Sequence, residues 1–215
     1  MAVRRPELVA GVLGLTAAII LIAVWAVDPP LADRLTRENE AVEWLQVALF
    51  ALGAALALGA AWKLRGIGAS PVLEILVAAM LMSLIIGEVD LDRVVTGHKI
   101  IHTLFFVDAR VPLGWRVVAG LVLVVPPIAL AFYAFVRRVE LIAATWRAVR
   151  TPWGRTFVAG VLLFGVTEVF ERPLGHVVGL PKYMAEESLE LISAIWMAVG
   201  AFARLRALRN GAMKP

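Results

Sequence analysis

The sequence predicts an all-α protein, a polytopic bundle of about six transmembrane helices that forms one membrane domain over residues 1–215. The first observation is composition: 61% of the residues are hydrophobic, and the mean hydropathy is +0.85. Soluble domains average roughly 45–50% apolar residues. One small core cannot hide such an excess, so lipid must be the solvent for much of the surface. The second observation is that the apolar residues form long runs.

Six of these runs approach the roughly 20 residues that a helix needs to cross a bilayer. They cover residues 8–27, 42–62, 72–87, 115–136, 153–170 and 188–203. Asp28-Pro29-Pro30 ends the first run, because the residue before a proline disfavours the helical conformation. The segment 138–152 instead alternates apolar and basic positions at helical spacing. This pattern predicts an amphipathic helix on the membrane surface.

The charges predict the orientation. Six crossings place both termini and the connections 63–70 and 137–155 on one side. That side holds 13 of the 21 basic residues and 3 of the 17 acidic residues. The positive-inside rule makes it cytoplasmic, so we expect a multi-pass protein of the bacterial inner membrane with both termini inside. The basic residues flank apolar runs, so we expect the lipid bilayer, and no nucleic acid, as a partner.

Carboxylates gather on the opposite, outer side, at four helix ends. Glu43 opens the second span, Glu88 closes the third and precedes Asp90 and Asp92, Glu168 and Glu171 close the fifth, and Glu186, Glu187 and Glu190 open the sixth. The positive end of a helix dipole favours acids at helix starts, which accounts for Glu43, Glu186 and Glu187. Glu88, Glu168 and Glu171 lie at helix ends and need another partner. Arg93 and Arg172 are available, but acids outnumber bases on this side.

Histidines suggest a metal. His98 and His102 have i,i+4 spacing, which places both imidazoles on one helix face, as in helical zinc sites. A divalent metal such as zinc would complete its shell with carboxylates from Glu88, Asp90, Glu168, Glu171, Glu187 or Glu190. His176 lies in the next outer segment. Two alternatives stay open: the histidines are satisfied by acids or water, or they relay protons. Segment 91–106 is also apolar enough to lie along the outer interface.

Three segments carry a resemblance. RENEAVEWLQ (37–46), GEVDLDRVVTG (87–97) and EESLELI (186–192) resemble a loose class of uncharacterised bacterial inner-membrane proteins. That resemblance implies no activity. The H-x-x-x-H pair with nearby acids is also similar to ceramidase-type membrane metal hydrolases, which share a helical bundle. The chain departs from them in its number of spans and in lacking a clear third zinc histidine.

These features support three hypotheses about function. The first is a binding or structural protein, such as an accessory subunit that associates with other membrane-protein subunits. The second is a metal-dependent membrane enzyme at the outer leaflet. The third is a proton- or cation-coupled carrier that uses Glu168, Glu187 and Glu190, and it requires a polar path to the cytoplasm.

Overall fold

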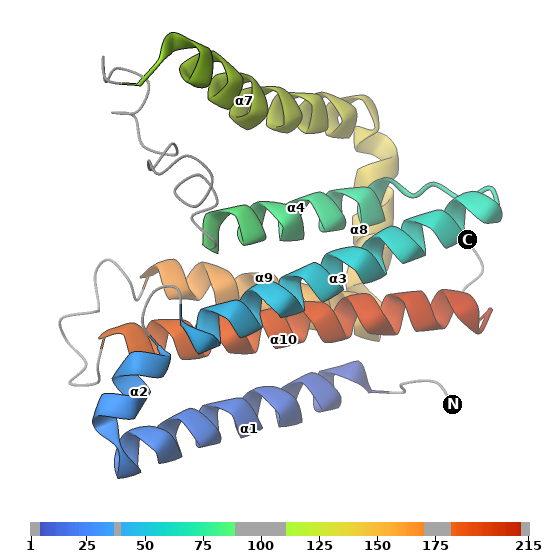
Figure 1. Cartoon of the computed structure of the whole chain (residues 1–215). Coiled ribbons are helices and arrows are strands. Elements are labelled where there is room, and N and C mark those ends of the chain that lie inside the picture. The colour runs from blue at the N-terminus through green and yellow to red at the C-terminus, as the bar shows by residue number, and fades with distance from the viewer. Residues whose placement is uncertain (1–4, 37–39, 89–110, 170–181, 212–215) are drawn as a thin grey trace.

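The computed structural model describes residues 5–36, 40–88, 111–169 and 182–211, and these residues are almost entirely helical (Figure 1). In chain order the helices are α1 (Pro6–Val27), α2 (Pro29–Leu35), α3 (Ala41–Gly66), α4 (Val72–Glu88), α7 (Leu113–Val136), α8 (Arg138–Val149), α9 (Pro152–Val169) and α10 (Lys182–Arg209). The all-helical prediction is confirmed for this part of the chain. Each of the six apolar runs falls on a long helix, and the amphipathic segment falls on α8.

The first helix ends where the Asp28-Pro29-Pro30 sequence predicts. The Asp28 main-chain N–H closes α1 by donating to the carbonyl of Val24 at 2.8 Å. Its side-chain Oδ1 then accepts a hydrogen bond from the Leu31 N–H at 3.0 Å and caps α2. Prolines suit the first positions of a helix, because their missing N–H would be unpaired there anyway. One aspartate therefore ends one helix and starts the next, and the sequence analysis did not foresee the short α2.

The bundle is built around α10, which contacts α9, α3 and α1, while α4 packs against α3. Figure 1 shows α3 and α10 running in one direction and α1, α4 and α9 running in the opposite direction. We call the end where α3 and α10 begin the acidic end. The opposite end, where α3 and α10 finish and α8 lies, is called the basic end.

Three of the described helices are long and apolar enough to cross a membrane. They are Pro6–Val27, Ala41–Gly66 and Met184–Arg209. Large apolar side chains on α1, such as Leu15 and Ile19, are exposed, as expected for a surface that faces lipid. The chain is therefore compatible with a membrane protein. The other three predicted spans coincide with α4, α7 and α9, and a total of six spans remains a prediction.

Glycines allow α9 and α10 to approach closely. A Cβ atom at Gly160 would lie 3.0 Å from the main-chain N of Met197, and one at Gly200 would lie 2.9 Å from the main-chain N of Phe157. Distances this short leave no room for any side chain. Small residues serve the same purpose where membrane helices pack backbone to backbone. This contact fixes α9 against the middle of α10.

An apolar layer fills the middle of the bundle. It consists of Phe50, Ala54, Leu81, Phe157, Ala194 and Met197, and all six are buried. The Phe50 ring meets Phe164 edge to face, with centroids 6.2 Å apart. These residues come from α3, α4, α9 and α10, so the layer joins the four helices and separates the acidic end from the basic end.

Helix α7 stands apart from the other long helices. It makes few contacts, which involve α4 and α8, and Figure 1 shows it beside α4, away from α10. Its exposed apolar side chains include Leu121, Val125, Ile128 and Phe132. Within the described residues α7 therefore presents an apolar surface that the bundle itself does not cover.

Candidate functional site at the acidic end

A buried amide–carboxylate pair marks the acidic end. The Gln46 Nε2 of α3 donates to the Glu187 Oε2 of α10 at 2.9 Å and to the Glu187 main-chain carbonyl at 3.1 Å. Gln46 is 0% exposed and Glu187 is 7% exposed. The Gln46 Oε1 is also buried and has no hydrogen-bond partner among the described residues. Because an unpaired buried acceptor costs about 1–3 kcal/mol, this atom is a place where a ligand could bind.

Four more carboxylates surround this pair. Glu43, Glu88 and Glu186 lie near enough to Glu187 to act on its charge. Glu190 lies near the hydroxyl of Thr167, which is buried on α9, and near Glu88. We call these residues the acidic-end cluster: Glu43, Gln46, Glu88, Thr167, Glu186, Glu187 and Glu190. Four helices contribute to it, so the cluster exists only in the folded bundle.

Two carboxylates of the cluster, Glu187 and Glu190, lie on α10 without a basic partner among the described residues. Carboxylates in a low-dielectric environment repel one another strongly and lose much of their hydration. The arrangement therefore favours any group that brings positive charge to the cluster, whether a proton, a metal cation or a ligand ammonium group.

The position of Glu187 corrects the sequence analysis. The helix that carries it begins at Lys182, and its first turn contains no acidic residue. The helix dipole acts mainly on the first turn, so the prediction that it accounts for Glu186 and Glu187 is wrong. Glu43 does lie in the first turn of α3, as predicted. Glu187 is held by Gln46 instead.

The remaining candidates divide according to what the structure describes. Glu43, Glu88, Glu187 and Glu190 all lie at the acidic end. Glu168 belongs to α9, but its side chain lies outside the described residues. So do the candidates of two further segments: Asp90, Asp92, Arg93, His98 and His102, and Glu171, Arg172 and His176. Across the ranges that the structure describes, no group of three or more His, Cys, Asp or Glu residues is placed to hold a metal ion.

Gln46 is the functional candidate that the sequence analysis missed. A signal was present, because Gln46 is an uncharged polar residue inside an apolar helix and lies three positions after Glu43, on the same face. Thr167 gave no comparable signal. Its hydroxyl donates to the carbonyl of Phe164 at 2.7 Å, as threonines in helices commonly do, and only the fold places it beside Glu190.

A second polar contact lies beyond the apolar layer, towards the basic end. The Arg204 guanidinium of α10 binds Glu74 Oε1 of α4 through Nη2 at 2.7 Å and Nε at 2.8 Å. Both side chains are largely buried, and Arg204 also stacks over the Trp153 ring at 4.7 Å. This carboxylate, unlike Glu187, has a matched counter-charge. It therefore has a complete structural explanation.

Comparison with known proteins returned no relative. No protein-family model, no curated protein and no solved structure matches the chain.

Proposed function

We propose that this chain is an integral membrane binding protein whose acidic-end cluster takes up a cation or a cationic group. The observation that carries the proposal is the buried Gln46–Glu187 pair, because within the described residues it sets a carboxylate that has no basic partner beside an amide oxygen that has no donor. Carboxylate, amide and hydroxyl oxygens accept hydrogen bonds from an ammonium group and can also contact a simple cation, and the cluster does not need the convergent set of three acids that is absent from the described residues. A bound cation would offset the repulsion among the surrounding carboxylates.

The apolar layer favours binding over transport. A carrier would need polar groups along the route from the acidic end to the basic end. Phe50, Leu81 and Met197 instead occupy the middle of the bundle and are almost completely buried. Along α10 the distance from Glu190 to Arg204 is about 21 Å, at a rise of 1.5 Å per residue. We infer that the bound group enters and leaves at the acidic end.

We further propose that the protein sits in the bacterial inner membrane with six crossings, and that it serves as an accessory subunit. The alternating directions of the long helices and the excess of basic residues at one end support this topology.

The separate position of α7 supports the subunit role, because its apolar side chains such as Val125 and Phe132 are open to a helix of a partner. Native mass spectrometry of the gently solubilised protein tests this role, and a lone monomer under all conditions would count against it.

The cation proposal is tested by thermal unfolding in detergent while NaCl, MgCl2, CaCl2 or ethylammonium chloride, a simple amine, is titrated at constant ionic strength. We expect at least one cation to raise the melting temperature of the wild type, since a ligand that binds only the folded state stabilises it. Glu187→Gln should abolish the shift. Glu40→Gln is the matched control, because Glu40 is an exposed carboxylate at the same end of α3, and it should keep the shift.

Two results would overturn the proposal. One is a wild-type melting temperature that responds to none of the cations and to no amine. The other is a shift that Glu187→Gln and Glu40→Gln reduce equally, because that would be general surface electrostatics.

A further inference from the structure

A cavity lies at the basic end and is independent of the acidic-end cluster. Its volume is about 450 Å³, within the range of small-molecule sites. The walls come from α3, α4, α8, α10 and the turn between α8 and α9. Apolar side chains such as Leu64, Leu73 and Val139 form much of the lining, and charged groups stand among them.

The two acids in this lining already have partners. Glu74 is bound by Arg204. Glu140 Oε1 accepts from Arg137 Nη1 at 2.6 Å, and its Oε2 accepts from the Ser70 hydroxyl at 2.7 Å. These bonds, first that of Ser70 and then that of Arg137, hold the pKa of Glu140 below its ordinary value of 4.5, so the carboxylate stays ionised at neutral pH. Neither acid is left to neutralise another cation.

Arg147 is the cation that remains. It lines the cavity, its side chain is exposed, and it has no hydrogen-bond or ion-pair partner within the described ranges. The unbalanced charge of the cavity is therefore positive. A planar guanidinium with free N–H groups is well suited to bind a phosphate group.

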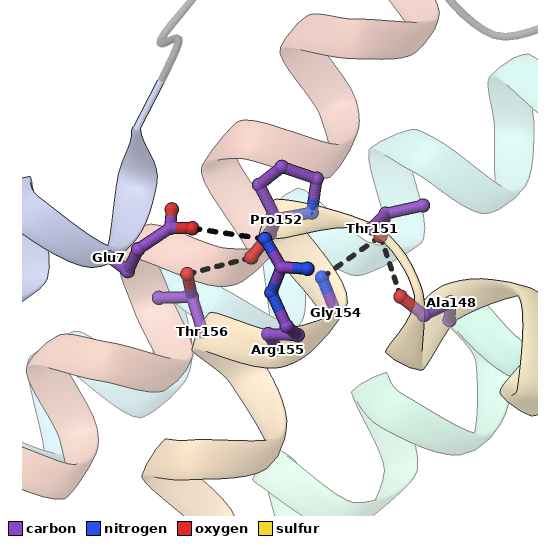
Figure 2. Close-up of polar contacts among 7 residues, drawn as sticks. All are labelled: Glu7, Ala148, Thr151, Pro152, Gly154, Arg155 and Thr156. Carbon is purple, nitrogen blue, oxygen red and sulfur yellow. Dashed lines mark hydrogen bonds and ion pairs between the residues drawn. The ribbon is translucent and has the colours of Figure 1, made fainter.

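An unpaired donor lies in the same lining. Trp153 is 8% exposed, and its indole Nε1 has no acceptor among the described residues. Its position at the start of α9 is set by the turn after α8 (Figure 2), where the Thr151 hydroxyl donates to the Ala148 carbonyl at 2.6 Å and accepts from the Gly154 N–H at 3.2 Å. The turn is tied to α1 through Arg155 and Glu7 at 3.3 Å. The turn therefore holds the main chain at the start of α9, and Arg204 stacks over the Trp153 ring at 4.7 Å.

Helix α8 places this cavity at the level of lipid headgroups. The helix exposes apolar side chains, including Val139, Ile142 and Trp146, and it carries several arginines. Arg150 stacks over the Trp146 ring at 4.7 Å. Exposed apolar residues interleaved with arginines are typical of helices that lie in a membrane interface. Basic pockets between membrane helices commonly bind anionic headgroups.

We propose that this cavity binds the phosphate-bearing headgroup of an anionic phospholipid, with Arg147 as the principal cation and the apolar wall against the glycerol and upper acyl carbons. The apolar wall favours a lipid over a free phosphate ion, which would bind Arg147 but leave the wall empty. The ion pairs of Glu74 and Glu140 keep the cavity open and fixed without taking part in binding.

The test uses the full chain, purified in detergent and incubated with phosphatidylglycerol or phosphatidylcholine, with retained lipid counted by native mass spectrometry. We expect the wild type to retain phosphatidylglycerol. Arg147→Gln should lower its affinity about tenfold, the effect of losing one charge-assisted hydrogen bond. Ala144→Phe should block binding, because Ala144 lines the cavity and a phenyl ring would fill it. Arg150→Gln is the matched control, since Arg150 is the C-cap residue of α8, carries the same charge and lies outside the lining.

The possible results separate the occupants. Equal losses in Arg147→Gln and Arg150→Gln would overturn the proposal, because they would reflect general attraction to an anionic surface. Equal retention of phosphatidylcholine and phosphatidylglycerol would overturn the claim that the cavity selects an anionic headgroup. Displacement of the lipid by millimolar glycerol phosphate would assign the cavity to a soluble phosphate and overturn the lipid. The melting temperature of each variant is measured as well, to check that the variant is folded.

Discussion

The two ends of the bundle bury carboxylates in opposite ways. At the basic end Glu74 is 4% exposed and meets Arg204 through two contacts. At the acidic end Glu187 is 7% exposed and meets only the amide of Gln46 among the described side chains. Burying charge without a counter-ion is costly, whereas a paired and hydrogen-bonded charge costs far less. Burial is therefore common to both carboxylates, and what distinguishes them among the described residues is the charge of the partner.

The largest expected effect comes from breaking the balanced pair. Arg204→Leu leaves Glu74 buried and unpaired, so the free energy of unfolding should fall by about 3–5 kcal/mol. The double variant Glu74→Leu/Arg204→Leu should recover most of this loss, because no charge remains. Chemical unfolding in mixed micelles measures both. If Arg204→Leu were as stable as the wild type, the Glu74–Arg204 ion pair would not contribute to the stability of the fold.

The next effect concerns the apolar layer that separates the two ends. Gly160→Ala places a methyl group 2.8 Å from Met197 Cγ and 3.0 Å from its main-chain N, so α9 must move away from α10. We expect a loss of about 1–3 kcal/mol, as for other overpacked cores. Gly165→Ala on the same helix has nothing within 4 Å and serves as the control. It should be neutral or slightly stabilising, and an equal loss in both variants would contradict the close approach.

Replacing glutamate by glutamine at each end tests the difference between the two buried carboxylates most directly. Glu74→Gln removes the charge partner of Arg204 and should destabilise the protein by about 1–3 kcal/mol. Glu187→Gln keeps the shape and still accepts from Gln46 while removing an unbalanced charge. Without added cation it should therefore be neutral or stabilising by about 1 kcal/mol. If Glu74→Gln and Glu187→Gln lowered the free energy of unfolding equally, Glu187 would have a counter-charge as Glu74 does.

The smallest effect is a pH dependence at the basic end. Because the pKa of Glu140 lies below its ordinary value of 4.5, its ionised form stabilises the folded state above that pH. This contribution is lost as the pH falls through the lowered pKa. Ser70→Ala removes the hydroxyl that donates to Glu140, so it should lower the melting temperature slightly at pH 7 and make no difference in acid. A difference that grows in acid would contradict the assignment.

Much of the fold follows from local patterns. The apolar runs fall on helices, and Asp28 ends the first one, because the length of a run and a proline both act within a few residues. The start of α10 was predicted at residue 188, whereas the helix begins at Lys182. The segment 182–187 is polar and resembles a loop in the sequence. In the structure it belongs to α10, because a helix can continue beyond its apolar span. That difference changes the explanation for Glu187.

The candidate site could be predicted only in part. Counting charges indicated that Glu43, Glu88, Glu187 and Glu190 gather at one end, because alternating crossings fix which helix ends are neighbours. Counting charges could not identify Gln46, because it is uncharged. Its importance comes from its hydrogen bond to Glu187, which lies 141 positions away in the chain. The metal site proposed for His98 and His102 lies outside the described residues and stays a prediction.

An all-helical chain, the apolar runs and the unequal charge of the two ends could be inferred from the sequence alone, because periodicity, run length and charge are local properties. Only the tertiary structure decided which buried carboxylate has a counter-charge. The rotation of each helix about its axis sets these pairings, and the close contacts at Gly160 and Gly200 help to fix that rotation for α9 and α10. With α4 and α10 also held in place, Arg204 reaches Glu74, whereas the partner of Glu187 among the described side chains is the amide of Gln46.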